Sequence, residues 1–274
     1  MRPKPCDILL TNDDGIDSPG LWAAAAALSE LGEVTVVAPR DQASTTSRSM
    51  PITSDGIIQK RSICHNGKMW KAYSIGGTPA QCVQHGILEI LKRRPELVVS
   101  GINYGENVGY SISLSGTVGA AMEGAALGIP ALAMSLQVKN FEDVYQHSDH
   151  IDFSIAGYFT KYFAELALSK PFPPDVHILK IDVPADATPQ TPWQITHLAR
   201  HQAFEAVPTR TGPWSEPGRL TGRLIPVRPD ELDPGADIHV LRFKNKVTVT
   251  PISLDMTSRV DFQQLEVLLR GENE

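Results

Sequence analysis

The amino-acid sequence predicts an α/β fold: a Rossmann-like, doubly wound and mostly parallel sheet, followed by a C-terminal extension made of a β-hairpin and a helix. Through the first two thirds of the 274 residues, short apolar runs rich in β-branched residues alternate with longer helical patterns, which is typical of βαβ units. A hydrophobic share of 42% suffices for a sizeable core. We find no internal repeat and no long linker, so we expect a single domain with its core at about 1–184 and the extension at about 185–274.

The first βα unit opens the chain. Residues 7–11 (DILLT) form a short apolar run, which predicts a buried strand. Residues 21–31 are rich in alanine and are followed by Gly32, as expected of a helix with a glycine at its end. Residues 33–38 (EVTVVA) are mostly β-branched or small and predict the second strand.

The middle of the chain repeats this alternation. Thr78 and Pro79 are a typical N-cap and first helical residue, so we expect a helix over 78–93. Residues 97–100 (LVVS) predict a buried strand, and 115–127 (SGTVGAAMEGAAL) a helix of small residues. The remaining core elements are then expected as a strand at 131–136, a long helix from about 148 to 170 and a strand at 177–183.

The extension has a different composition. Residues 185–235 are rich in Pro, Gly, Thr and Arg with few apolar runs, which predicts loops and extended excursions. Beyond them we expect an antiparallel hairpin of 237–243 and 246–250, turning at Lys244-Asn245. A short amphipathic helix at about 261–269 is expected last.

Composition narrows the class of function. The net charge of −6 is spread along the chain, and no run of Lys or Arg provides the basic stripe that binding of a nucleic acid polymer needs. No apolar run is long enough to span a bilayer, so we expect no membrane partner. The three cysteines, Cys6, Cys64 and Cys82, are odd in number and lack CxxC spacing. They indicate reduced thiols and a cytoplasmic location.

Short oxygen-bearing side chains follow three of the predicted strands. Asp13 and Asp14 come directly after the first strand, Ser44 lies just beyond the second, and Asn103 follows the strand at 97–100. In open α/β sheets, ligands bind outside the carboxyl ends of the strands. Two adjacent carboxylates at a buried strand end repel each other unless a cation relieves them. Carboxylate, hydroxyl and amide oxygens suit Mg²⁺ or Mn²⁺. The alternative is that Asn-Asp-Asp-Gly only forms a turn.

A second feature predicts phosphate binding. Ser115, Gly116 and Thr117 open a helix with small residues, whose exposed N–H groups and positive dipole end suit a phosphate. The alternative is an ordinary N-cap with small residues for close packing. Arg40 and Arg48 could touch substrate or be solvated loop charges. No G-x-S-x-G motif is present near Ser115, which disfavours a Ser/His/Asp hydrolase.

Taken in order, these motifs resemble the SurE family of nucleotidases. The similarity covers most of the chain except about 200–236, and no single motif is specific alone. The matching segments are 8–15 (ILLTNDDG), 36–39 with Ser44, 77–79 (GTP), 99–103 (VSGIN), Gly105-x-Asn107-x-Gly109, 115–118 (SGTV), 121–124 (AMEG), 181–184 (IDVP) and 247–251 (VTVTP).

The resemblance implies a metal-dependent enzyme that hydrolyses nucleoside 5′- or 3′-monophosphates, with exopolyphosphatase activity in some members of the family. It implies that the extension helps to build a homodimer or homotetramer by exchanging an arm. Carried onto this chain, the implied metal ligands are Asp13, Asp14, Ser44 and Asn103, and the implied phosphate-binding residues are Asn107, Ser115, Gly116 and Thr117. The chain departs from the family pattern at Thr45, where Gly is usual, at Leu114, where Tyr is frequent, and at Pro51, where Thr is frequent.

We therefore expect a 5′-nucleotidase with Mg²⁺ or Mn²⁺ as cofactor, a nucleoside monophosphate as substrate, and Asp13 and Asp14 as catalytic residues. Asp14 is our candidate for the base or the water-orienting group. An aspartyl-phosphate route usually uses two Asp residues one apart, whereas these are adjacent. A non-catalytic metal-nucleotide-binding sensor is the alternative function. A sugar-nucleotide glycosyltransferase usually needs a second Rossmann-like half, for which this chain is too short.

Overall fold

A computed structural model of the chain describes residues 6–139 and 150–271. A nine-stranded sheet runs through the molecule in the order β3-β4-β2-β1-β5-β6-β7-β11-β8. The six strands from β4 to β7 are mutually parallel, whereas β3 is antiparallel to β4 and β11 is antiparallel to β7. The strands are β1 (Cys6–Thr11), β2 (Gly32–Pro39), β3 (Ile58–His65), β4 (Lys68–Ile75), β5 (Leu97–Tyr104), β6 (Ala131–Leu136), β7 (Ile178–Val183), β8 (Trp193–Ile195) and β11 (Val247–Ile252).

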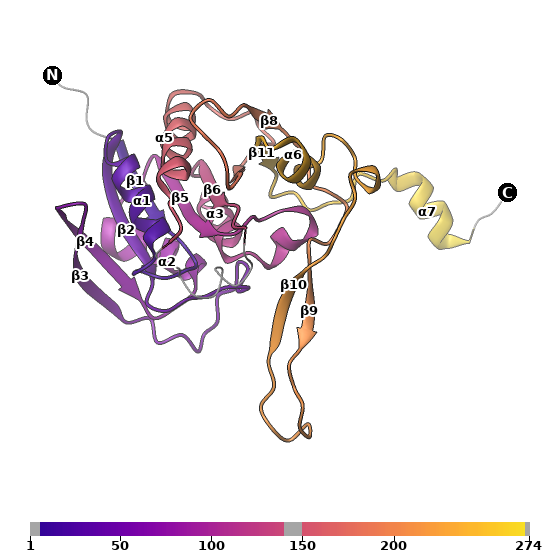
Figure 1. Cartoon of the computed structure of the whole chain (residues 1–274), viewed down its shortest axis with the longest axis horizontal. Coiled ribbons are helices and arrows are strands. Elements are labelled where there is room, and N and C mark those ends of the chain that lie inside the picture. Colours follow the sequence, from indigo (N-terminus) through magenta and orange to yellow (C-terminus); the bar gives the residue numbers. More distant parts are fainter. Residues whose placement is uncertain (1–5, 140–149, 272–274) are drawn as a thin grey trace.

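Helices cover both faces of this sheet (Figure 1). α1 (Pro19–Leu28) packs with α5 (Ser154–Ser169) on one face, and α2 (Pro79–His85) packs with α3 (Gly116–Ala126) on the other. The shorter helical pieces are the π-helix η1 (Gly86–Leu91), the 3-10 helices η2 (Gly109–Leu114) and η3 (Pro229–Glu231), and α6 (Asp237–Lys244). No helix within the described residues has the length and apolarity to cross a bilayer.

Two apolar layers hold the helices to the sheet. On the α1/α5 face, Leu10 and Val36 of the sheet share one layer with Leu21 of α1. On the α2/α3 face, Leu9 and Val37 belong to the second layer. Successive residues of β1 and β2 therefore point into opposite layers, as the pleat of a strand requires. Both faces being buried explains why these strands are apolar runs without polar alternation.

Two predicted helices have different ends in the structure. α1 ends at Leu28 rather than at residue 31, and Gly32 begins β2 instead of closing the helix. A Cβ at Gly32 would lie 2.2 Å from the carbonyl oxygen of Cys6, so this glycine allows β2 to approach β1. The helix predicted from about 148 begins at Ser154, and residues 148–149 lie outside the described part. Thr78 is the N-cap of α2, as predicted, and it forms a full capping box with Gln81; α2 ends at His85, however, and the π-helix η1 continues only to Leu91 rather than to residue 93.

The predicted hairpin at 237–250 is wrong. Residues Asp237–Lys244 form the helix α6, which ends where Asn245 adopts a left-handed φ of 48°. The strand that follows, β11, pairs with β7 rather than with its own predecessor. Ile238 and Leu241 are both buried, and their separation along the chain is the spacing of one helix face.

Hairpins occur elsewhere in the chain. β3 and β4 pair through the turn Asn66-Gly67, and both turn residues have positive φ. In the extension, β9 (Phe204–Pro208) pairs with β10 (Leu220–Leu224). Figure 1 shows this second hairpin projecting from the body of the molecule, while the last helix, α7 (Phe262–Arg270), lies apart from the sheet. The extension thus contains a hairpin and a helix, but the hairpin lies earlier in the chain than predicted.

Candidate active site

Asp13 and Asp14 lie at the carboxyl end of β1, and both are buried, with 4% and 3% of their surfaces exposed. β1 is the central strand between β2 and β5. Loops from both neighbouring strands therefore reach the same edge. The two carboxylates and residues of those loops line one cavity of about 460 Å³.

Asp13 is fixed from two sides. Its Oδ1 accepts a hydrogen bond from the Thr117 hydroxyl at 2.6 Å, and its backbone carbonyl accepts one from the Ala43 amide at 2.7 Å. Burial, and after it the charge of Asp14, raises the pKa of Asp13 to about 7. In the absence of a cation, this carboxyl group therefore holds a proton over much of the acidic range.

The first turn of α3 approaches Asp13 closely. A Cβ on Gly116 would lie 2.8 Å from the Cβ of Asp13 and 2.9 Å from its Oδ2. Only glycine leaves room for the helix at this distance. Ser115 is the N-cap, and its Oγ accepts from the Val118 amide at 3.1 Å. Ser115 lines the cavity, whereas Gly116 and Thr117 lie behind Asp13. The helix cap and the phosphate-binding role are therefore not exclusive alternatives.

Asp14 contacts the next strand. Its Oδ2 accepts a hydrogen bond from the Tyr104 amide at 3.3 Å. The turn that follows depends on Gly15, whose φ is +93°. Its carbonyl accepts from the Asn12 side chain at 3.0 Å. The turn that Asn-Asp-Asp-Gly was expected to form is present, and Asp14 lines the cavity as part of it.

Ser44 enters the site from the loop after β2. Its hydroxyl accepts from the Gln42 side chain at 3.0 Å. The next residue, Thr45, has a φ of 61°, a left-handed conformation that glycine adopts with least strain. This geometry explains why the resembling family usually carries Gly here. Further along the loop, the Arg48 guanidinium contacts the buried Glu123 carboxylate at 2.8 Å.

Asn103 and Asn107 come from the end of β5 and the loop after it. The Asn103 side-chain nitrogen donates to the carbonyls of Tyr104 (3.1 Å) and Gly105 (2.8 Å). Because the nitrogen faces the backbone, Oδ1 is the atom suited to a cation. The Asn107 side chain donates to the Ser135 hydroxyl at 2.9 Å. Both asparagines line the cavity.

The structure thus brings most of the predicted site residues to one cavity: Asp13, Asp14, Ser44, Asn103, Asn107 and Ser115. Neither loop arginine lines it, since Arg40 pairs with Asp41 and Asp55 and Arg48 with Glu123. Another part of the wall was missed from sequence. It comes from both strands of the β9–β10 hairpin and from the loop after β6, and it includes Phe204, Glu205, Ala206, Leu220, Thr221, Leu224, Val138 and Lys139.

The donor set fits a hard divalent cation. Within the described residues, no three His, Cys, Asp or Glu side chains gather as metal ligands. The cavity instead combines two buried carboxylates with the neutral oxygens of Ser44 and Asn103. Few charges and many oxygens are typical of Mg²⁺ or Mn²⁺ sites rather than of Zn²⁺ sites. Burial and, after it, the charge of Asp14 raise the pKa of Asp13, and a bound cation would offset both effects.

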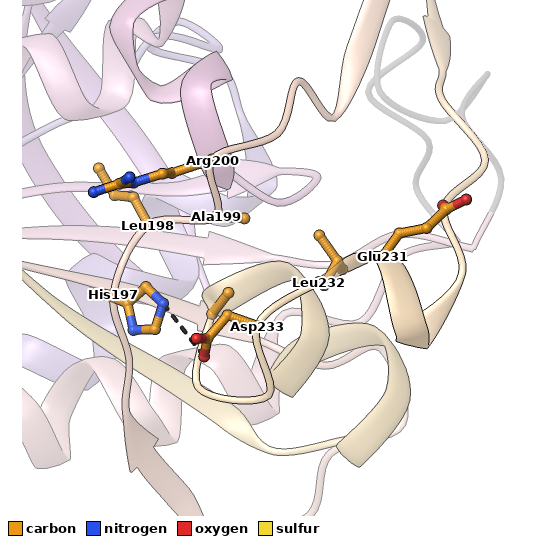
Figure 2. Close-up of a pocket in the computed structure, with 8 residues that line it drawn as sticks. His197, Leu198, Ala199, Arg200, Glu231, Leu232 and Asp233 are labelled. Atoms are coloured by element: carbon orange, nitrogen blue, oxygen red, sulfur yellow. Dashed lines mark ion pairs between the residues drawn. The ribbon is translucent and has the colours of Figure 1, made fainter.

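A second cavity, of about 410 Å³, lies between residues 197–200 and 231–236. Figure 2 shows His197 and Asp233 facing each other, while Glu231 points away from them. The His197 Nε2 atom lies 3.5 Å from Asp233 Oδ1. Both members of this pair are exposed, with 59% and 65% of their side-chain surfaces accessible. Acidic groups do not converge in this cavity, so it does not compete with the first as a candidate active site.

Comparisons with known proteins agree with this geometry. Residues 8–205 match the family described as Survival protein SurE. The 5′-nucleotidase SurE of Thermococcus gammatolerans is 42% identical over 267 residues, which cover 97% of each chain. The 5′-nucleotidase SurE of Methanosarcina barkeri is 40% identical over 276 residues, 98% of each chain. The crystal structure of the SurE protein from Aquifex aeolicus is similar with a TM-score of 0.72 and 28% identity, covering 97% of this chain and 100% of that one.

Proposed function

The chain belongs to the Survival protein SurE family, and from this premise we propose that it hydrolyses nucleoside 5′-monophosphates to nucleoside and phosphate with the help of a divalent metal ion. The family, the α/β fold and the enzyme class predicted from the sequence are confirmed by the comparisons. The observation that carries the proposal is the pair of adjacent buried carboxylates, Asp13 and Asp14, open to a cavity that Ser44 and Asn103 also line.

In this proposal, Asp13, Asp14, Ser44 and Asn103 hold Mg²⁺ or Mn²⁺. Such an ion, when bound, supplies charge neutralisation for the phosphate and lowers the pKa of water. Thr117 stabilises the ionised form of Asp13 through its hydroxyl. Asp14 orients the attacking water or accepts its proton. The backbone amide of Tyr104 donates to the Asp14 carboxylate and holds it in place for this role.

The phosphate group would lie between Asn107 and the first turn of α3. The positive end of the helix dipole favours an anion there, while the amides of Thr117 and Val118 already contact Asp13 and the Ser115 hydroxyl. Ser115 lines the cavity at this position, and Gly116 keeps the helix close to Asp13. Positioning and electrostatics are the main sources of catalysis in phosphoryl transfer, so these residues would contribute mainly by orienting the phosphate.

The other wall of the cavity fits a nucleoside. Phe204 and Leu224 line it together with the polar Thr221. An aromatic ring and aliphatic side chains suit a planar base, and a few hydroxyl groups suit a ribose. This part of the site supports a nucleotide substrate rather than free phosphate. Action on nucleoside 3′-monophosphates and on polyphosphate, which the family resemblance implied, belongs to the same proposal.

We also propose that the extension at about 185–274 joins copies of the chain into a homodimer or homotetramer. The helix α7 has no buried residue, and its apolar side chains include Phe262, Leu268 and Leu269, exposed by 62%, 70% and 76%. Trp214, in the loop of the projecting hairpin, is 94% exposed. Large apolar side chains exposed together on one helix are typical of an interaction site. We propose a cytoplasmic location as well, because Cys6, Cys64 and Cys82 are all free thiols.

The test of the catalytic proposal is phosphate release from AMP and GMP with added Mn²⁺ or Mg²⁺. We expect Asp13→Asn and Asp14→Asn to lose activity by at least about 10³-fold while keeping the circular-dichroism spectrum of the parent. Asp17→Asn is the matched control, because Asp17 is an exposed carboxylate close in sequence that pairs with Arg61. Equal activity of the Asp13 and Asp17 variants would refute the assignment.

The same assay separates the enzyme from a non-catalytic sensor. A sensor would bind metal and nucleotide, as measured by calorimetry, and release no phosphate. The chain keeps both carboxylates and the two neutral oxygen donors at the cavity, which favours catalysis.

A further inference from the structure

A buried cluster of three charged residues lies behind the candidate active site. Lys180, Asp182 and Asp237 are each 0% exposed. The Lys180 ammonium donates to Asp182 Oδ2 at 2.5 Å and lies 3.2 Å from Asp237 Oδ2. Lys180 and Asp182 belong to β7, whereas Asp237 begins α6 in the extension. The lysine therefore joins the core sheet to the extension.

The two carboxylates hold the loop that lines the cavity. Asp182 Oδ1 accepts from the Asn107 amide at 2.8 Å, and Asp237 Oδ2 accepts from the Gly109 amide at 3.1 Å. These two amides belong to one loop, which follows β5 and carries Asn107 to the cavity wall. Charge-assisted hydrogen bonds to backbone N–H groups are among the stronger ones in proteins. The loop is thus attached at two points to a single charge cluster.

The same cluster reaches the opposite wall. Asp237 Oδ1 accepts from the Ala199 amide at 2.9 Å. The carbonyl of His201 then accepts from the Tyr110 amide at 3.0 Å. The segment containing Ala199 leads directly into Phe204, which lines the cavity at the base of the hairpin. The positions of both walls are therefore linked through Asp237.

Burying three charges requires a reason. Desolvation of an ion pair often exceeds its Coulombic gain, and an apolar replacement of similar volume is frequently as stable. None of the three residues lines the cavity, so none touches the substrate. Burial would lower the pKa of Lys180, but the charges of Asp182 and Asp237 outweigh it, and the lysine stays charged. What the cluster does provide is a fixed position for the loop amides.

We propose that Lys180 is a positioning residue for substrate binding: by bridging Asp182 and Asp237 it holds the 105–109 loop, and with it the side chain of Asn107, at the active-site cavity. The role rests on the proposed function, since it gives Asn107 its place in the nucleotide site. Misplacement of a binding group by about 1 Å can cost up to about 10²-fold in rate.

The test uses a charge-matched variant. Lys180→Met alone leaves two uncompensated carboxylates and lowers stability. Lys180→Met with Asp182→Asn keeps the net charge of the cluster and keeps an oxygen that can accept from the Asn107 amide, so we expect its melting temperature to recover. This double variant still lacks the lysine that bridges Asp182 and Asp237. We therefore expect its KM for AMP to rise about tenfold, with kcat changed by less than about threefold. Recovery of KM together with stability would overturn the proposal.

A double-mutant cycle locates the effect. Asn107→Ala should raise KM to a similar extent, and adding the charge-matched pair to it should raise KM little further, because both changes remove the same contact. Additive increases in KM would contradict the proposal. Asp7→Asn is the control: it removes the buried partner of Arg93 at the far end of β1, so it should lower stability and leave KM unchanged.

Hydrogen exchange separates this proposal from the proposed function. If the wild-type protein releases no phosphate from AMP, the proposed function fails. The Lys180 bridge can still be tested by the exchange rates of the Asn107 and Gly109 amides. Faster exchange of these amides in the charge-matched pair than in wild type, with other core amides unchanged, supports the bridge. Equal protection of the two amides in both proteins overturns it.

Discussion

The parallel sheet and the C-terminal extension satisfy their apolar surface in different ways. In the sheet, β1, β5 and β6 are buried on both faces by helices of the same chain. In the extension, α7 buries none of its residues, and the β9–β10 hairpin projects from the body. Both regions have apolar side chains, so composition alone does not separate them. The sheet thus completes its own core, and so does the part of the extension around α6, whereas α7 and the β9–β10 hairpin leave large apolar side chains exposed.

The largest effect is expected on assembly. Replacing Leu265, Leu268 and Leu269 by Ser removes apolar surface worth about 1.5–3 kcal/mol for each side chain that becomes buried. We therefore expect association of the chain to weaken by more than about 10³-fold, as measured by sedimentation equilibrium. The Gln263→Ala/Gln264→Ala variant is the control and should associate as wild type does. A wild-type protein that is monomeric at all concentrations would contradict the proposal that the extension joins copies of the chain.

Within the sheet region, Gly116→Ala tests how tightly α3 is placed. The added methyl group would lie 2.8 Å from the Asp13 Cβ, so it must displace the carboxylate or the helix. We expect phosphatase activity to fall by about 10²-fold, measured with AMP. Gly157→Ala in α5 is matched to it, since its nearest neighbour would be the Ala23 carbonyl at 3.4 Å. That variant should keep activity and gain up to about 1 kcal/mol of stability.

The pH dependence of the metal-free protein follows from Asp13. Its folded-state pKa of about 7 is higher than the ordinary 3.8, so the folded protein binds a proton that the unfolded chain has already lost. The free energy of unfolding should therefore fall as pH rises from about 4 to 7, by up to about 1.4 kcal/mol per pH unit from this group. Added Mn²⁺ should restore stability, increasingly so at higher pH.

Urea unfolding with a chelator, at several pH values, measures this slope. Asp13→Asn is the control, because it removes the titrating group and leaves the others. The slope should be smaller in that variant than in wild type. Identical slopes in the two proteins would show that the Asp13 carboxyl group does not hold a proton in the metal-free state.

The smallest effect is expected at Thr45. A β-branched residue at a φ of 61° is strained, so Thr45→Gly should raise the free energy of unfolding by up to about 1 kcal/mol. Asn66→Gly in the β3–β4 turn, where φ is 49°, is the comparison. Asparagine tolerates this conformation, so its gain should be smaller. Only the Thr45 variant changes a cavity residue, and only it should alter KM. A lower free energy of unfolding in Thr45→Gly would show that the Thr45 backbone is not strained.

The strands of the core and the residues at their ends could be predicted because parallel strands buried on both faces leave a strong signal. Runs such as 7–11 and 131–136 are apolar without alternation, and the β1 strand end fixes where Asp13 and Asp14 lie. The chemical roles of these two carboxylates remain predictions. The opposite wall of the cavity could not be predicted, since residues 185–235 have few apolar runs and are placed by tertiary contacts.

Two local errors have separate causes. At 237–244, apolar and polar residues alternate closely enough to indicate a strand, yet burial of Ile238 and Leu241 together decides for a helix. The hairpin of β3 and β4 was overlooked although Asn66-Gly67 is a strong signal for a two-residue turn.

The buried charge cluster was hidden from sequence for a different reason. Lys180 and Asp182 were visible only as part of a strand. Their charges acquire meaning once Asp237, far away in sequence, is brought beside them. Only the tertiary structure makes this contact, so no local pattern could have predicted it.

The cavity joins a wall at the carboxyl end of the sheet to a wall made by the strands of a projecting hairpin. Asp13 and Asp14 belong to the first wall, and Phe204, Leu220 and Leu224 belong to the second, together with Glu205. Substitutions in the hairpin can therefore alter which molecule is accepted without touching the groups that would carry out the reaction. Selectivity and chemistry can change independently in such an architecture.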